Sequence, residues 1–438
     1  MTRIASIFLL IVFTTPFVSF AQTDSLTLQK LIEEVLRNNY DIAIALNNNK
    51  AASNNATKGQ AGYYPNVALN ANGNYSNNNT NLSFAGGLDP VEVKGAQNTS
   101  LGTNIGVNYV LFNGFGRVHT YYSLMARQQL SAVQSQILSE NLILDAVNKY
   151  LDLQQAILNL KVADENLKIS EERLKRTKVA NENGVKSKID LWTAQVDLTN
   201  DSLAVLSQKA IIRKQLANLN LVMGRNPTDK LLLINEIPVP EIKDLAEAKN
   251  KALQSNATLL LSKISLKLSE ESAASIGAQQ YPQINLNASY GINSSQNGAG
   301  IVLSQKTLGL NSGVTFTMPI FAGNQLTTAM KNAAITSENS ELEIKKATQN
   351  IEYQFEAAAI DLELLQANIL ALESNISLAE LALKRATLSY NEGLITYNDL
   401  RIVQLNVLAA KNRRNEATIS LVRLFYGINR LSGELLAN

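Results

Sequence analysis

The sequence carries one structural pattern twice. Residues 64–71, YPNVALNA, reappear as residues 281–288, YPQINLNA, at an offset of 217 (281 minus 64). Farther along, the matching residues keep an offset of 209 (393 minus 184). These matches are Phe112-Asn113-Gly114 with Phe321-Ala322-Gly323, Gly184 with Gly393, Asp190-Leu191 with Asp399-Leu400, and Gly224 with Gly433. Because loops tolerate length changes and rigid elements do not, the constant offset predicts a duplicated unit whose second copy has one shorter loop.

Each copy ends in a long stretch that favours helix. Residues 117–223 contain no proline and one glycine, and residues 324–438 contain no proline and three glycines. Proline and glycine are the residues that interrupt helices most strongly, so their scarcity predicts long helices. A helix over 115–183 would extend about 100 Å, more than three times the ~30 Å of a bilayer core. Since this stretch is rich in Lys, Asp and Glu, it must project through water.

Leucine spacing in the first long helix predicts coiled-coil packing. One heptad series is Leu130, Ile137, Leu144, Leu151 and Leu158, and a second is Leu153, Leu160, Leu167 and Leu174. A heptad series forms the seam between packed helices. Two series on one helix predict neighbours on more than one side, as in a wall of helices. A single antiparallel pair is the alternative.

The segments before each pair of long helices alternate between apolar and polar residues. The apolar members are Val67, Leu69, Ala71, Tyr75, Ile105, Val107, Tyr109, Leu111, Ile284, Leu286, Ala288, Tyr290, Leu308, Leu310, Val314, Phe316 and Met318. Their neighbours are mainly Asn, Gly, Ser and Thr. Such uncharged alternation is typical of transmembrane β-strands, with one face toward lipid and the other toward water. An ordinary half-exposed sheet is the alternative, although its wet face usually carries Lys and Glu.

Four strands cannot close a barrel by themselves. Small closed barrels need about eight strands, and an open strand edge is not viable in lipid. The chain must therefore oligomerise if it enters a membrane. Three copies would supply twelve strands, and cyclic symmetry would close the barrel.

The chain begins like an exported protein. Arg3, the apolar run 4–12 and Ser19-Phe20-Ala21 form the basic, apolar and small-residue regions of a secretory signal peptide, with cleavage expected after Ala21. A short membrane anchor is the alternative, but Pro16 interrupts the run before the ~20 residues needed to span a bilayer.

Composition excludes several function classes. The chain has no cysteine, and its net charge of +2 gives no broad attraction to nucleic acid. It shows no nucleophile–base pair, phosphate loop or metal cluster, so we expect no enzyme, no cofactor and no metal. His119 is the only histidine and is a poor candidate for a metal ligand, while Trp192 is better explained as a packing residue.

These signals predict a mixed, mainly α-helical protein with a duplicated unit. Residues 1–21 are the signal peptide, 22–226 the first repeat and 243–438 the second, joined by a proline-containing linker at 227–242. In each repeat we expect a helix, two strands and a helical hairpin, in that order. The expected ranges are 26–61, 66–112 and 115–224 in the first repeat, and 243–279, 283–320 and 324–433 in the second.

The chain resembles the TolC-type outer-membrane efflux protein family along its whole mature length. The resemblance rests on the duplication, Tyr-Pro before the first strand, Phe-x-Gly after the second strand, and Gly-x-x-[Ser/Thr]-x-x-Asp-Leu at each hairpin tip. It implies a homotrimer whose twelve-stranded β-barrel in outer-membrane lipid is continued by an α-helical tunnel in the periplasm of a Gram-negative cell. It also implies a passive duct, the outer component of a tripartite efflux or type I secretion system. The partners would be a periplasmic adaptor (membrane fusion protein) and an inner-membrane pump of the resistance-nodulation-division or ABC type.

The two hairpin tips contain the candidate functional residues. Gly184 and Gly393 are expected to end a helix in the left-handed conformation. Ser187 and Thr396 have the position of N-caps, and an aspartate stands three residues after each, where the helix dipole favours an acidic residue. Capping alone explains both aspartates.

A functional interpretation of the tips is compatible with capping. In a trimer, Asp399 would occur three times around the periplasmic aperture. The remaining tip residues would contact the adaptor: Gly184, Lys186, Lys188, Asp190, Gly393, Thr396 and Tyr397. Two departures weaken the family pattern, because Ile402 replaces the second acidic residue of some members and Ile395 replaces a basic one. The competing function is a trimeric coiled-coil structural or surface protein without transport activity.

Overall fold

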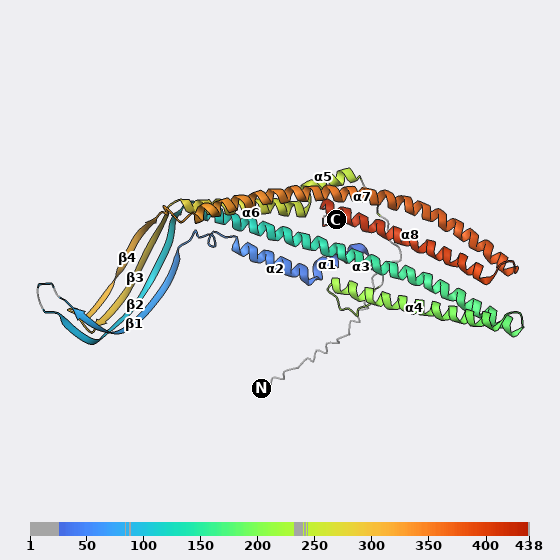
Figure 1. Ribbon diagram of the computed structural model, residues 1–438, viewed down its shortest axis with the longest axis horizontal. Coiled ribbons are helices and arrows are strands. Elements are labelled where there is room, and N and C mark those ends of the chain that lie inside the picture. The colour runs from blue at the N-terminus through green and yellow to red at the C-terminus, as the bar shows by residue number, and fades with distance from the viewer. Residues whose placement is uncertain are drawn as a thin grey trace, which may run out of the picture. The chain divides into compact units, whose positions relative to one another are not determined.

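The computed structural model describes residues 26–83, 85–86, 89–231, 240, 242 and 244–436 (Figure 1). The predicted signal peptide, residues 1–21, lies outside this range, as do residues 232–239 and 241 of the predicted linker. The chain forms two compact units. One contains the described residues up to Arg37 and those of Ala146–Pro238, and the other contains the described residues of Asn38–Asp145 and Val239–Asn438.

The second unit contains a single antiparallel sheet of four strands in the order β1-β2-β3-β4 (Figure 1). The strands are β1 (Asn66–Leu82), β2 (Val91–Asn113), β3 (Gln283–Asn297) and β4 (Ser304–Thr317). Thus the hairpins of the two repeats share one sheet through the pairing of β2 with β3. Each strand exceeds the 9–11 residues that a tilted strand needs to cross a bilayer. No helix among the described residues is both long and apolar enough to span a membrane.

The strand register brings the predicted apolar residues together on one face. Val67 pairs with Val107, which pairs with Ala288, and Leu286 pairs with Val314. Leu111 departs from the predicted alternation, because a register shift between Val110 and Phe112 leaves it unpaired with β3 and sets Phe112 opposite Ile284. A β-bulge adds one residue to a strand and so exchanges the faces beyond it.

The two predicted helical hairpins are present. Hairpin 1 consists of α3 (Gly116–Glu182) and α4 (Lys188–Val222), and hairpin 2 consists of α7 (Gln325–Asn391) and α8 (Tyr397–Ser432). The first helix of each hairpin has 67 residues, about 100 Å at the α-helical rise. Strand and helix meet at a sharp turn with positive φ, 64° at Gly114 and 57° at Gly323. Glycine provides the left-handed conformation that this turn requires.

Shorter helices precede each sheet hairpin. We predict one helix over 26–61 and one over 243–279, whereas the structure has two in each segment: α1 (Leu28–Asn38) and α2 (Tyr40–Asn55), then α5 (Leu245–Ser255), α6 (Ala257–Gly277) and a 3₁₀ turn, η1 (Ala278–Gln280). The division falls at Asn39 and Asn256. Both are N-caps in an extended or otherwise non-helical conformation, and each accepts backbone hydrogen bonds from the helix that follows.

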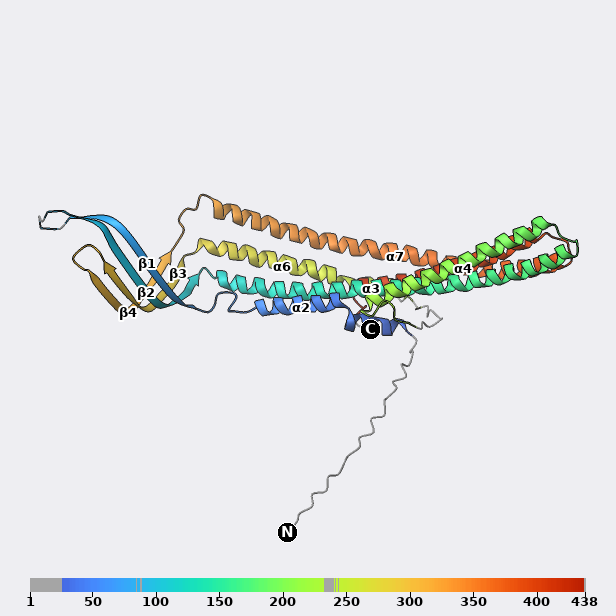
Figure 2. The same cartoon turned by 90° about the horizontal axis from the view of Figure 1, so that it is seen from below.

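Packing in the second unit accounts for the first two residues of the first heptad series. Leu130 and Ile137 of α3 pack against a cluster that contains Val133 and, from α6, Ala257 and Ile264. On another side of α3, the Ser135 hydroxyl donates to the carbonyl of Ala45 in α2 at 3.0 Å. The helix therefore has neighbours on more than one side, as predicted, and the single-pair alternative is wrong. A larger cluster around Ile351, Phe355 and Ile428 joins α7, α8, α5 and α6, and Figure 2 shows α6 running beside α7.

Candidate functional site

The tip of hairpin 1 is a helix stop followed by a helix start. Gly184 has a φ of +74°, and the amide of Val185 donates to the carbonyl of Ala180 at 2.8 Å, which satisfies the end of α3. Asn181 Nδ2 donates to the carbonyl of Lys186 at 2.7 Å and so holds the turn from inside. Lys186 and Lys188 are exposed to solvent on either side of Ser187.

The capping box predicted at Ser187 is confirmed. The amide of Ser187 donates to Asp190 Oδ2 at 3.0 Å, and the amide of Asp190 donates to Ser187 Oγ at 3.2 Å. Each side chain thus satisfies a backbone donor that the first turn of α4 leaves without a partner. The Asp190 carboxylate is held in place by the backbone.

The tip of hairpin 2 has the same local geometry. Gly393 has a φ of +75°, and the amide of Leu394 donates to the carbonyl of Ser389 at 2.9 Å. The amide of Thr396 donates to Asp399 Oδ2 at 2.9 Å, and the amide of Asp399 donates to Thr396 Oγ1 at 3.3 Å. In addition, the ring of Tyr397 packs edge-on against Tyr390, with centroids 6.0 Å apart.

These hydrogen bonds affect the charge of both tips. The Thr396 hydroxyl, followed by the Thr396 amide, lowers the pKa of Asp399 below its ordinary value, and Ser187 lowers the pKa of Asp190 in the same two ways. Hydrogen bonds to the ionised form of a carboxyl favour that form. Each tip therefore carries a fixed negative charge at neutral pH, close to solvent.

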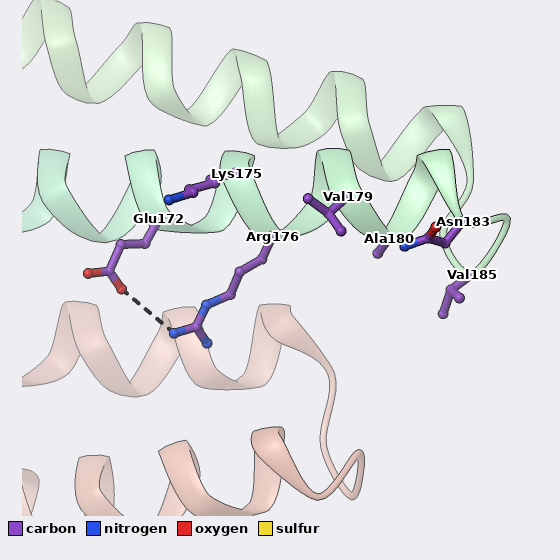
Figure 3. A pocket seen from close by; sticks show the side chains of 7 residues that line it. All are labelled: Glu172, Lys175, Arg176, Val179, Ala180, Asn183 and Val185. Atoms are coloured by element: carbon purple, nitrogen blue, oxygen red, sulfur yellow. Dashed lines mark ion pairs between the residues drawn. The ribbon is translucent and has the colours of Figure 1, made fainter.

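A surface hollow lies beside the first tip. It is lined by one face of α3 and by the residue that follows the glycine turn, as Figure 3 shows: Glu172, Lys175, Arg176, Val179, Ala180, Asn183 and Val185. Glu172 and Arg176 form an exposed i,i+4 ion pair at 3.9 Å. Val179 and Val185 are 52% and 75% exposed. Sequence reasoning missed this surface, although the spacing of three and four residues along α3 could have indicated it.

Hairpin 1 also contains a buried polar network that the sequence analysis missed. Asp201 of α4 accepts a hydrogen bond from Asn166 Nδ2 at 2.8 Å and another from the hydroxyl of the fully buried Ser170. One turn farther toward the tip, Arg173 pairs with Asp197. The sequence contains a signal for this network. Asn166, Ser170 and Arg173 lie three or four residues apart on α3, and Asp197 and Asp201 lie four residues apart on α4, so each set shares one helix face. The network fixes the register of α3 against α4.

Hairpin 2 lacks this network. At the offset of 209, Ser170, Arg173 and Asp201 correspond to Ala379, Ala382 and Ala410. Its interhelical ion pairs are more exposed. Lys411 lies 3.0 Å from Glu380, and Arg414 lies 4.0 Å from Glu373. Such surface pairs contribute little to stability.

A small enclosed cavity of about 140 Å³ lies among the helices of the second unit and includes Glu140, Asn256 and Arg430 in its lining. Burial raises the pKa of Glu140, whereas a hydrogen bond from Gln136 and the charge of Arg430 oppose this rise. One carboxylate beside a guanidinium is not the ligand set of a metal ion.

The single histidine has a structural partner. His119 Nδ1 lies 2.9 Å from Glu271 Oε2, which links α3 to α6. Among the residues that the structure describes, no group of three or more His, Asp or Glu side chains could hold a metal ion. Trp192, predicted to be a packing residue, is 60% exposed on α4, so most of its side chain is not packed within this chain.

Comparison with known proteins follows the same duplicated layout. The family model described as "Outer membrane efflux protein" matches residues 31–225 and again residues 248–434. The chain belongs to the outer membrane efflux protein family. Each match covers one repeat, which confirms the duplication, and the predicted outer-membrane location follows from the family. A search of curated proteins found no significant match.

Solved structures share the fold at low sequence identity. The outer membrane protein VceC of Vibrio cholerae aligns with a TM-score of 0.75 at 17% identity, over 93% of this chain and 96% of that one. The CmeC outer membrane channel of Campylobacter jejuni gives 0.77 at 15% identity, over 93% and 86%. The open state of the MtrE outer membrane channel of Neisseria gonorrhoeae gives 0.74 at 18% identity, over 93% and 89%. The fold is thus that of outer-membrane channels in this family.

Proposed function

We propose that the chain is a passive export channel that assembles as a homotrimer. Three four-stranded sheets would close a twelve-stranded barrel in outer-membrane lipid, and the long helices would continue it as a tunnel into the periplasm. In this role the protein is the outer component of a tripartite efflux or type I secretion system. The proposal is supported by the chain's membership of the outer membrane efflux protein family.

The observation that carries the proposal is the sheet with two open edges. β1 and β4 each have a single neighbour within the described chain, so each leaves one row of backbone donors and acceptors without a strand. On the apolar face, Leu69, Leu310 and Phe316 are 72%, 68% and 63% exposed. Lipid can cover that face, but it cannot satisfy the edges, so pairing of β4 with β1 of the next copy is the remaining solution.

The tips support a docking role. Both present a rigid, capped turn with exposed charged or polar groups, and the hollow beside the first tip adds the exposed Val179 and Val185. A helical partner can pack on such a surface with residues at i, i+3 and i+7. We propose that these tips contact a periplasmic adaptor and that Asp399 lines the aperture in three copies.

Energy for export would come from a partner. The sequence has no nucleotide-binding glycine-lysine loop, and the family is one of channel proteins. We therefore propose that the chain catalyses no reaction and that an inner-membrane pump of the resistance-nodulation-division or ABC type drives transport. A coiled-coil stalk remains the competing function, but a stalk needs no sheet with a continuous apolar face.

Mass measurement of the protein extracted in mild detergent tests the assembly. We expect the mass of three mature chains, and brief cross-linking in intact cells should give the same trimer. A monomer under both conditions would contradict the proposal, because a monomer leaves the β1 and β4 edges open.

A further inference from the structure

Where all four strands pair, the polar face of the sheet contains no ionisable side chain. Glu92 and Lys94 lie in the first part of β2, before its pairing with β3 begins at Asn98. The paired segments are 66–78 of β1, 96–113 of β2 and 283–297 of β3. They contain no Asp, Glu, Lys, Arg or His. In β4 the single charged residue is Lys306. It pairs with Ser294, two residues from Ile292, and so lies on the apolar face.

Carboxamides take the place of charges on this face. Rows of the sheet contain them on every strand: Asn66, Asn70, Asn72, Asn74, Asn98, Asn104, Asn108, Asn285, Asn287, Asn293, Gln305 and Asn311. Asn66, Asn108 and Asn287 occupy one row directly across β1, β2 and β3. The amides thus form a continuous lining.

Glycines make room for these amides on the sheet surface. Gly102 pairs with Asn72 on one side and Asn293 on the other. A Cβ at Gly102 would lie 2.6 Å from Asn72 Oδ1 and 3.2 Å from Asn293 Oδ1, so both side chains lean over the glycine. Beside it, Asn70 Nδ2 donates to Asn104 Oδ1 at 3.2 Å. The amides therefore lie along the wall in contact with one another.

An amide lining does not distinguish the sign of a charge. Each carboxamide offers an oxygen that accepts hydrogen bonds and a nitrogen that donates them, so the same residue solvates a cation or an anion. Charged rings, by contrast, select one sign in pores. The long helices carry many charged residues, and the tips carry Asp190 and Asp399, so the uncharged lining is a property of the sheet.

We propose that the barrel wall is indifferent to the sign of cargo charge, so that this segment passes polar cations, anions and uncharged polar molecules alike. Discrimination by charge then falls to the helical part of the channel. The inference rests on the proposed function, because it takes the polar face to be the lumen.

A chain without cysteine allows a direct test. Asn108→Cys places a thiol on the polar face, and Val107→Cys places one on the opposite face of the same strand. Cells that produce either full-length variant are exposed to methanethiosulfonate reagents that carry a trimethylammonium or a sulfonate group. Each rate is divided by the rate of the same reagent with a small free thiol. For Asn108→Cys we expect the two normalised rates to agree within about twofold, since the side chains of the polar face are uncharged and create little local potential. The nearby Arg117 guanidinium donates to the carbonyls of Val110 and Leu111 and lies over the ring of Tyr109, which belongs to the apolar face.

A preference of roughly tenfold or more for one reagent at Asn108→Cys would overturn the inference, because a tenfold difference between a singly charged cation and a singly charged anion requires a local potential of about 1 kT per elementary charge. Asn287→Cys, in the same row on β3, repeats the measurement if the first variant is not exported. The double variant Asn108→Cys/Asn287→Asp should react several-fold faster with the cationic reagent. If it does not, wall charge has no control over access and the inference fails.

The two accounts fail in different ways. If Val107→Cys reacts as fast as Asn108→Cys, or if neither reagent reaches Asn108→Cys and Asn287→Cys, the polar face does not line a water-filled channel and the proposed function fails. If only the polar-face thiols react, but with a strong preference for one sign, the channel stands and the charge-indifferent wall does not.

Discussion

Thr396 and Asp399 hold each other across the first turn of α8. The amide of Thr396 donates to the Asp399 carboxylate at 2.9 Å, and the amide of Asp399 donates to the Thr396 hydroxyl at 3.3 Å. The Thr396 hydroxyl also lies 2.6 Å from the same carboxylate oxygen. Asp399 Oδ2 therefore accepts both capping hydrogen bonds, from the amide and the hydroxyl of Thr396, while the carboxylate remains exposed to solvent. Cap and charge can be separated by substitution.

Replacement of Asp399 by asparagine tests the proposed aperture. Asparagine can still accept from the Thr396 amide, but the charge is lost from each of three subunits. We expect the cation-to-anion permeability ratio to fall about twofold or more, with the channel still assembled. Thr396→Ala should weaken the cap and leave the ratio nearly unchanged. The matched Asp190→Asn should also leave the ratio nearly unchanged. If Asp399→Asn itself leaves the ratio unchanged, Asp399 is a capping residue and does not line the aperture.

Acid should loosen the second tip. Hydrogen bonds from Thr396 lower the pKa of Asp399 below its ordinary value of 3.8, so the folded tip favours the ionised form. The stabilisation is present above pH 3.8 and is lost as the pH falls through the lower pKa of the folded state. The protection factor of amides in the first turn of α8, which is the intrinsic exchange rate at each pH divided by the measured rate, should fall in that acidic range. In Thr396→Ala this extra acid sensitivity should be smaller, because only the backbone amide at position 396 then lowers the pKa of Asp399. Equal sensitivity in both proteins would contradict the assignment.

Two paired glycines should respond differently to alanine. Gly291 lies opposite Gly309 in the β3–β4 ladder. A Cβ at Gly291 would lie 2.4 Å from the carbonyl oxygen of Thr103 and 2.4 Å from Asn104 Cβ, whereas nothing lies within 4 Å at Gly309. Gly291→Ala should therefore disturb the β2–β3 pairing and reduce the amount of heat-resistant oligomer, whereas Gly309→Ala should leave the β2–β3 pairing intact. If both variants form the same amount of oligomer, the close approach of β2 to Gly291 is not required for assembly.

Loss of Asp201 should loosen hairpin 1. Asp201→Ala removes the acceptor of the buried Ser170 hydroxyl and one hydrogen bond of Asn166, at a cost of about 2 kcal/mol. Hydrogen exchange of α4 amides near Asp201 should rise accordingly. Ser202→Ala, at the exposed neighbouring position, should change little. Unchanged exchange in Asp201→Ala would mean that apolar packing alone holds the hairpin.

Much of this fold follows from the sequence, because its signals are local and repeated. Glycines at a constant offset of 209 mark both hairpin tips, and the capping boxes predicted at Ser187 and Thr396 are present in the structure. Uncharged alternation located all four strands. These predictions succeeded because they rest on regular spacing, the two-residue alternation of the strands and the constant offset of the repeat, which can be read from a single sequence.

The remaining features depend on tertiary contacts. The division of each short helical segment at Asn39 and Asn256 escaped prediction, because asparagine is also tolerated within a helix and only its cap geometry reveals the break. The bulge at Leu111 depends on how β2 meets β3, a strand 170 residues farther along the chain (283 minus 113). The hydrogen bonds of Asp201 likewise depend on the register of two helices. The roles of Asp399 and of the tip lysines stay predictions, since a capping aspartate has the same spacing whether or not it lines an aperture.

Conductance through the purified protein tests the central claim most directly. The detergent-extracted oligomer is added to a planar lipid bilayer, and the current is followed at fixed voltage. A passive channel predicts stepwise increases of one uniform size, each from one inserted oligomer, that need neither nucleotide nor partner. A trimer that inserts or binds without any conductance step would contradict the account and favour the coiled-coil stalk.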